Sequence, residues 1–339
     1  MSSSWPDFLT QTTSFQADSQ CFASPLDDIR LASTETVTVP LTHLGLIRAS
    51  GEDAATLLHN LLSSNIEALK PDEAVRSSLN TPKGRMLADF LVWRDGGDVL
   101  LQLAAELAPA IARKLSMFVL RAKAKLVDAS EEVAAIGLAG PRLAEVLETL
   151  GLALPEQAMQ TRDDEGIRVV RLDEQRVMLI AASAAAPELW RKLIAAGACA
   201  AGPLAWRLLD IRAGIPQITA ATQEEFVAQM INFELIGGVN FRKGCYTGQE
   251  IIARMQYRGT LKKRMYRARI DAEAPAPGSD VFASDFGDQP AGKIVSSAPS
   301  PEGGCEVLVC VQIASHDAGG VRLAGGEPLA FEELPYPLA

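Results

Sequence analysis

The sequence predicts an α+β protein with two related mixed units followed by a small all-β unit. Two observations carry this prediction. The order strand, helix, strand, strand, helix occurs twice in the first ~200 residues, which indicates an internal repeat. From Met265 onward, short strand-like runs alternate with turns rich in glycine and proline, as is typical of a small β-barrel. A poorly ordered lead-in and the three units are expected at residues 1–35, 36–130, 131–262 and 263–339.

The first unit is expected to contain an extended stretch, a helix, a strand, a hairpin and a long helix. Ser50 and Asp53 are suitable residues for starting the first helix, and the DGGD segment between two apolar runs predicts the hairpin. These elements span residues 37–49, 53–62, 74–79, 87–103 and 107–125.

The second unit repeats this order with different side chains. Its strand, helix, hairpin and second helix span residues 134–140, 141–150, 167–182 and 187–197. Gly140 ends the first strand of this unit, as Gly51 does in the first unit, so both glycines are expected at a strand–helix corner. A further helix is expected at Trp206–Gly214.

Composition limits the classes of function. The 339 residues are 48% hydrophobic and 22% charged, which is ordinary for a soluble globular protein. The net charge of −10 argues against general nucleic-acid binding, though not against a local basic patch that contacts RNA. No apolar run approaches the roughly 20 residues of a membrane span, and the N-terminal stretch has no basic or apolar region of a secretory signal. We therefore expect a cytoplasmic protein without a membrane partner.

Cysteine and histidine usage indicates neither a disulfide framework nor a metal centre. The five cysteines are scattered and no pair has C-x-x-C spacing, which is typical of a reduced compartment. The three histidines lie at no metal-ligand spacing, so no protein-built metal site is expected. His59, within an apolar helix pattern, is interpreted as structural.

The segment GGVNFRKGCYTGQEIIARMQYRG at Gly237–Gly259 carries the strongest functional signal. An apolar strand-like piece with Val239 and Phe241 leads into a loop, and a helix pattern follows. Thr247 and Glu250 have the spacing of a capping box, which predicts a helix start within a residue or two of Thr247.

Cys245 lies just before this expected helix and beside Lys243. Helix N–H groups and nearby cations stabilise a thiolate, so the pattern predicts an accessible, reactive thiol. Nine Lys or Arg and one acidic residue lie between Arg242 and Arg269, so this stretch carries +8 in a chain of −10. It is interpreted as a site for an anion or an anionic tail. An inert cysteine is the alternative interpretation.

Two further side chains are candidates for chemistry. Asp89 follows the turn-rich TPKGRM segment, where it could act as a general acid or base, hold a ligand amine, or serve only the turn. Trp206 could stack on a flat ligand or pack in the core of an amphipathic helix.

At the segment RKGCYTGQE, residues 242–250, the chain closely resembles the YgfZ family of folate-binding proteins, which are relatives of the glycine-cleavage T-protein. The resemblance runs from about Leu41 to the C-terminus. It includes PKGR from Pro82, IRAGIP from Ile211 and LPY from Leu334.

This resemblance implies two ferredoxin-like-type α+β domains around a central opening, followed by a small β-barrel. It implies binding of tetrahydrofolate or another reduced folate in that opening. It also implies an accessory role in assembling or repairing iron–sulfur clusters of client enzymes, including radical enzymes that thiolate tRNA. A monomer is expected.

The resemblance also assigns site residues. Trp206 matches an aromatic of the family's folate pocket, whereas Leu44 replaces a second one. Arg212 stands where the T-protein has a pterin-binding Glu, and Ala88-Asp89 where it has paired aspartates. The expected catalytic residues are Cys245 and Asp89, and the expected folate-binding residues are Trp206, Leu44, Lys243, Tyr246, Gln249, Glu250, Arg254 and Arg212.

Three functions follow from these assignments. In the favoured one, Cys245 meets the folate at the central opening, and the helix at residues 249–258 holds the glutamyl tail or an anionic client. The second is a folate-dependent one-carbon transferase of the aminomethyl type that uses Asp89 as acid or base. The third is a factor that contacts RNA directly through the basic stretch and so assists tRNA modification.

Overall fold

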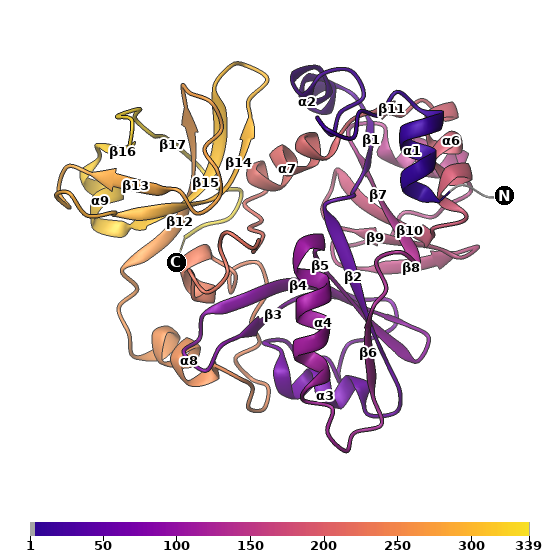
Figure 1. Ribbon diagram of the computed structural model, residues 1–339, viewed down its shortest axis with the longest axis horizontal. Helices are drawn as coiled ribbons and strands as arrows, with labels where there is room; N and C mark the ends of the chain where they lie inside the picture. Colours follow the sequence, from indigo (N-terminus) through magenta and orange to yellow (C-terminus); the bar gives the residue numbers. More distant parts are fainter. Residues whose placement is uncertain (1–3, 339) are drawn as a thin grey trace.

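The computed structural model describes residues 4–338, whose strands form three sheets (Figure 1). The first sheet has the order β3-β4-β5-β2-β6, with every neighbouring pair antiparallel. Its strands are β2 (Leu44–Ser50), β3 (Ala74–Asn80), β4 (Met86–Asp95), β5 (Asp98–Ala104) and β6 (Lys125–Asp128). The helices of this unit are α3 (Ala54–Leu61) and α4 (Ala108–Ser116), with a 3-10 turn η1 (Ala105–Leu107) before α4.

The second sheet has the order β11-β1-β7-β10-β9-β8. Its strands are β1 (Val37–Pro40), β7 (Val133–Ala139), β8 (Thr161–Asp164), β9 (Ile167–Arg171), β10 (Arg176–Ala182) and β11 (Cys199–Ala200). The helices α5 (Leu143–Thr149) and α6 (Ala186–Ala195) belong to this unit. The strand β1 precedes the first unit in the chain, yet it pairs with β7. The two mixed units are therefore interleaved rather than consecutive.

The predicted internal repeat is present in the strand order. The run β3-β4-β5-β2 in one sheet matches β8-β9-β10-β7 in the other. Gly51 and Gly140 end equivalent strands with φ of +108° and +125°. A β-carbon at either position would overlap a backbone carbonyl, that of Lys123 or that of Glu35. Each corner therefore needs glycine for the left-handed backbone and for the close approach of a neighbouring chain segment.

The C-terminal unit is a curled antiparallel sheet of order β16-β13-β14-β15-β12-β17. Among residues 4–338 its edge strands do not pair with each other, so the expected barrel is open. Its strands are β12 (Lys263–Ile270), β13 (Asp280–Ala283), β14 (Gly292–Pro299), β15 (Cys305–Gln312), β16 (Val321–Leu323) and β17 (Ala330–Glu332), with helix α9 (Ile313–Ala318) after β15.

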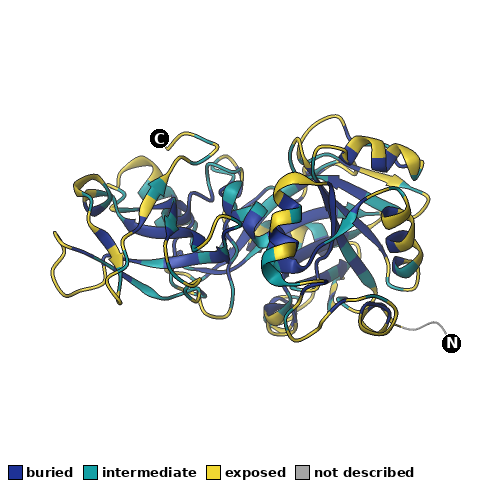
Figure 2. Ribbon diagram, turned by 90° about the horizontal axis from the view of Figure 1, so that it is seen from above, coloured by how far each residue is buried: buried dark blue, intermediate teal, exposed yellow. Residues whose placement is uncertain are grey.

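The C-terminal unit extends to one side of the two mixed units, and buried residues follow the strands of both parts (Figure 2). The helix α7 (Pro203–Arg212) lies at the junction, where it packs against α2, β1, β14 and β15. A 3-10 turn η2 (Ala228–Ile231) and the helix α8 (Gln249–Tyr257) complete the connection to the C-terminal sheet. No helix in the described part of the chain is long and apolar enough to cross a membrane.

The expected disorder of the lead-in is wrong for residues 4–35, while residues 1–3 lie outside the described residues. This segment forms the helices α1 (Trp5–Thr12) and α2 (Pro25–Thr34). Trp5 and Phe22 lie against Trp190 of the second unit, with ring centroids 5.9 and 5.4 Å apart. The buried Asp28 carboxylate accepts hydrogen bonds from the Phe22 and Gly202 N–H groups. Aromatic burial therefore offsets the polar composition of this segment.

One helix length and one helix cap differ from the prediction. The helix expected at residues 107–125 ends at Ser116; residues 117–124 form turns, with Leu120 at a positive φ of +44°, and residues 125–128 join the first sheet as β6. The helix of the cysteine segment begins at Gln249, two residues after Thr247 as predicted, with Gly248 at its N-cap and no side-chain cap. The capping box predicted for Thr247 and Glu250 is therefore absent there.

Candidate functional site

A narrow cavity of about 60 Å³ lies where the two mixed units and α7 meet. The sequence-predicted residues Trp206, Leu44 and Asp89 line it, and so do Arg76 and Asp210. Strands from both sheets and the helix α7 deliver these side chains to one place. The structure thus brings three of the predicted site residues together between the repeated units.

Trp206 is positioned by its contact with β7. The indole is 2% exposed, and one of its faces lies against Gly137, where a β-carbon would overlap the ring. The guanidinium carbon of Arg176 lies 5.6 Å from the ring centroid. The core interpretation of Trp206 is confirmed, because the ring packs in the core. The ring also forms a wall of the cavity, and its stacking on a ligand stays a prediction.

Asp89 is a carboxylate in a poorly solvated position. Its Oδ1 accepts a hydrogen bond of 2.6 Å from the Ile218 N–H. Burial raises the pKa of Asp89 to about 6, although the Ile218 N–H and the positive charge of Arg76 oppose this shift. A carboxyl group with such a pKa can exchange a proton near neutral pH, so Asp89 fits the role of a general acid or base.

Asp210 is a second carboxylate in the cavity that the sequence reasoning missed. It lies four residues after Trp206 on α7, and this i, i+4 spacing on one helix face is the signal that could have revealed it. Its Oδ1 accepts a hydrogen bond of 2.6 Å from Arg176, whose Nε is 2.7 Å from Asp173. Burial raises the pKa of Asp210, and the ion pair with Arg176 opposes the rise.

A wider cavity of about 700 Å³ lies next to the narrow one. The two share Arg76, Leu172 and Ile215 in their linings, and the wider cavity adds Arg176 and Arg212. The Arg212 guanidinium, however, is held by the Glu306 carboxylate of the C-terminal sheet, with an Nη2–Oε1 distance of 2.6 Å. Arg212 therefore joins two parts of the protein and does not line the narrow cavity that holds Trp206.

The predicted residues Lys243 and Tyr246 hold the cysteine loop in place. The Lys243 ammonium donates hydrogen bonds to the carbonyls of His59 and Leu62 at the C-terminus of α3, the latter at 2.6 Å. It also lies 4.9 Å from the centroid of the buried Tyr246 ring. Burial lowers the pKa of Lys243 to about 8. Because its donors face helix carbonyls, Lys243 is placed to anchor the loop rather than to hold a ligand in either cavity.

The remaining residues of the motif lie on the outside of this loop and of α8. Cys245 is exposed, as predicted, and so are Glu250 and Arg254, while the Gln249 amide donates to the Gly244 carbonyl at 3.4 Å. In the described chain, the linings of the narrow and the wide cavity do not include Cys245. The Cys245 thiol therefore lies on the surface, whereas the cavity lined by Trp206 lies in the interior.

The basic stretch is partly neutralised by acidic partners. Arg264, Arg267 and Arg269 form ion pairs with Glu234, Glu306 and Glu302, respectively. The exposed basic residues of this stretch are Arg242, Arg254, Arg258 and Lys262. The charge available to an outside partner is therefore smaller than the sequence count suggests.

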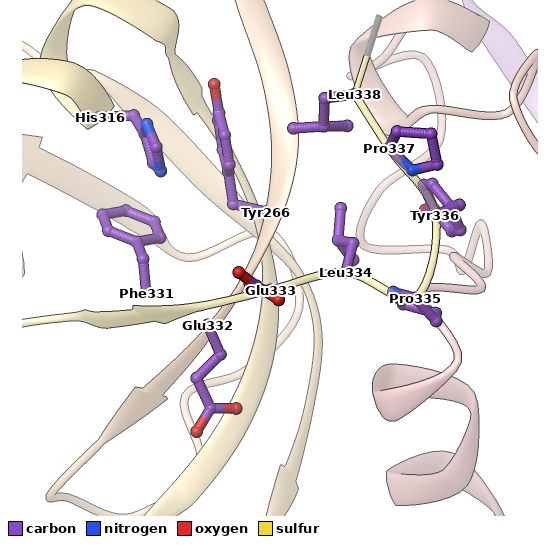
Figure 3. Close-up of a pocket in the computed structure, with 10 residues that line it drawn as sticks. All are labelled: Tyr266, His316, Phe331, Glu332, Glu333, Leu334, Pro335, Tyr336, Pro337 and Leu338. Carbon is purple, nitrogen blue, oxygen red and sulfur yellow. The ribbon is translucent and has the colours of Figure 1, made fainter.

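A third cavity, of about 600 Å³, lies between the C-terminal sheet and the final segment of the chain (Figure 3). The rings of Tyr266 and His316 stack with centroids 3.8 Å apart, and Phe331 packs edge-on against His316. The Tyr336 hydroxyl donates to the Gly214 carbonyl at 2.7 Å and so fixes the other wall. None of the predicted site residues lines this cavity.

Comparison with known proteins is consistent with this architecture. Residues 9–233 match the family model described as the GCVT N-terminal domain. The chain is similar to the tRNA-modifying protein YgfZ of Colwellia psychrerythraea, with 27% identity over 90% of this chain and 94% of the relative. It is similar to the protein of the same name from Photorhabdus laumondii, with 29% identity over 89% and 94%.

The fold is shared with a solved structure. The glycine cleavage system aminomethyltransferase T from Bartonella henselae superposes with a TM-score of 0.75 over 92% of this chain and 89% of that protein. The identity between the two is 18%, so this likeness concerns the fold alone.

Proposed function

Because the chain belongs to the GCVT N-terminal domain family, and within it to the YgfZ family, we propose that it binds tetrahydrofolate or another reduced folate between its two mixed units. The observation that carries the proposal is the pair of carboxylates, Asp89 and Asp210, beside Trp206 in one cavity. A pterin ring presents several N–H donors along one edge, and ionised carboxylates are the side chains suited to accept them.

The donor set fits a folate even though Arg212 stands where the T-protein has its pterin-binding Glu. Asp210 lies two residues before Arg212 on α7 and supplies a carboxylate to the cavity in its place. Trp206 offers an apolar wall for the ring.

The cavity sizes set a condition on binding. The narrow cavity of about 60 Å³ is far below the roughly 300 Å³ at which small-molecule sites begin, whereas the adjacent cavity of about 700 Å³ is within their range. Binding of a pterin next to Asp89 therefore requires the walls of the narrow cavity to move apart. The segment Ile215–Gln217 lines this cavity without helix or strand structure.

In the cell we propose an accessory role in tRNA modification, exercised through iron–sulfur client enzymes in the cytoplasm. The YgfZ relatives bear the name tRNA-modifying protein. The exposed Cys245 and the exposed cations Arg242, Arg254 and Arg258 form a surface that a negatively charged client can approach.

A one-carbon transferase is the second candidate, and the raised pKa of Asp89 favours it. Substitution separates the two functions. A Cys245→Ala variant that retains client-enzyme activity, together with an Asp89→Asn variant that loses it, would support the transferase. Salt-dependent tRNA binding by the isolated protein would instead support direct contact with RNA through the exposed cations.

Calorimetric titration of the full chain with reduced folates tests the proposal. We expect the wild type to bind and Trp206→Ala to bind at least about tenfold more weakly, because a wall of the cavity is lost. Cys245→Ala is the matched control and should bind as the wild type does, since the thiol lies outside the cavity. Absence of binding by the wild type would refute the proposal.

A further inference from the structure

Arg76 differs from the other arginines around the two cavities. Arg176 is ion-paired with Asp173 and Asp210, and Arg212 is ion-paired with Glu306. Within residues 4–338, the Arg76 side chain has neither a hydrogen-bond partner nor an ion-pair partner; Asp210 and Asp89 act on it only through their charge. Arg76 lines both cavities.

An unpaired guanidinium in this half-buried position costs the folded protein some of its hydration. Arginine stays protonated in proteins, so an ion-pair partner would compensate for this loss. Burial indeed lowers the pKa of Arg76 from its ordinary value, with the carboxylate of Asp210 opposing the shift. The five N–H donors of the fork remain free to meet an anion that enters from the wider cavity.

The two cavities differ in the charged groups that they offer beside Arg76. The narrow one presents the carboxylates of Asp89 and Asp210, which favour N–H donors. The wide one is lined by Arg176 and Arg212, which are already ion-paired, and by the carboxylates of Asp173 and Glu174, so Arg76 is the lining arginine that lacks an ion-pair partner in the described chain. A folate has a donor-rich pterin at one end and a glutamate with two carboxylates at the other, so its two ends match the carboxylates of the narrow cavity and the unpaired Arg76.

We propose that Arg76 receives a carboxylate of the folate's glutamate tail, with the pterin in the narrow cavity and the tail leading into the wide one. This inference rests on the proposed folate binding. It assigns the tail to a place other than the helix α8, because the exposed Arg254 and Arg258 of α8 line neither cavity. Arg76 is thus a binding residue that selects ligands with an acidic tail.

The test uses two probes with the full chain. One is 5-formyltetrahydrofolate, which carries the glutamate tail, and the other is 6-methyltetrahydropterin, which lacks it. We expect Arg76→Gln to weaken binding of the tailed probe by about tenfold or more, the loss of one charge-assisted contact, with the tailless probe changed by less than about twofold. Arg76→Lys, which keeps the charge, should lose less than Arg76→Gln, and Arg254→Gln on α8 should bind as the wild type does.

Each outcome has a defined meaning. An Arg76→Gln variant that binds the tailed probe as the wild type does, or that loses both probes equally, would overturn the assignment of Arg76 to the tail. If Arg254→Gln binds the tailed probe more weakly than the wild type, the tail binds at α8 instead. Failure of the wild type to bind either probe would refute folate binding itself, and this inference with it.

A measurement on the unmodified protein covers the case in which Arg76→Gln does not fold. The wild type should bind the tailed probe more tightly than the tailless one, and the difference should shrink as salt is raised, because an ion pair is screened. Equal affinities at low salt would contradict a role of any cation in holding the tail.

Discussion

The indole of Trp206 occupies the space that a side chain on Gly137 would need. Gly137 lies in the middle of β7 and Trp206 on α7, so this contact joins the helix that forms a wall of the candidate folate cavity to the second sheet. Glycine is required here by close approach rather than by an unusual backbone angle. Contact with β7 therefore fixes the position of the indole ring.

Substitution at this contact should reveal coupling between the two residues. We expect Gly137→Ala to lower the free energy of unfolding by about 1–3 kcal/mol, since the added methyl group overlaps the ring. In a Trp206→Ala background the same change should cost much less, because the space is vacant. A double-mutant cycle by urea denaturation measures the difference, and strictly additive effects would contradict the contact.

Asp89 should make stability depend on pH in an uncommon direction for a carboxylate. Its pKa in the folded protein, about 6, lies above the ordinary value of 3.8. Between these values the folded state keeps a proton that the unfolded state has released, so stability falls as pH rises from about 4 to 6.

The Asp89→Asn variant removes this cost and keeps an oxygen that can accept from the Ile218 N–H. At pH 7.5 we expect it to be more stable than the wild type by about 1–3 kcal/mol, with the gain disappearing towards pH 4. Thermal unfolding across this range measures the effect, with the exposed Asp18→Asn as control. A variant less stable than the wild type at pH 7.5 would contradict the predicted cost of ionisation.

Lys243 should stabilise the cysteine loop without contributing to the affinity for the ligand. Lys243→Met leaves the carbonyls of His59 and Leu62 without their donor, and we expect a loss of about 1–3 kcal/mol in the free energy of unfolding. The exposed Lys262→Met is the control and should change stability little. If Lys243→Met keeps its stability but loses affinity for reduced folates, the lysine contacts the ligand after all.

Cys245 should be the first thiol to react in the folded protein. Cys21, Cys305 and Cys310 are at most 1% exposed, whereas Cys245 is exposed on its loop. Alkylation with iodoacetamide, followed by mass spectrometry of peptides, should modify Cys245 at least about tenfold faster than these three. Cys245→Ala should remove the fast phase, and similar rates at all cysteines would contradict the exposed position.

The sequence by itself determined the features that depend on local spacing. The repeated order of strands and helices and the glycine corners at Gly51 and Gly140 follow from periodicity and from backbone angles that few residues adopt. The exposed cysteine loop and the membership of the GCVT N-terminal domain family follow from a contiguous motif, which needs no knowledge of distant contacts.

Only the tertiary structure decided which charged residues face the candidate site. Asp210 and Arg212 are two positions apart on α7, yet the first lines the narrow cavity and the second pairs with Glu306, 94 residues away. The rotation of α7 is fixed by its packing against both β1 and β14, and no local pattern encodes it. For the same reason Lys243 turned out to be an anchor, and Arg76 emerged as an unpaired cation. The pairing of a charge depends on which segments the fold brings beside it.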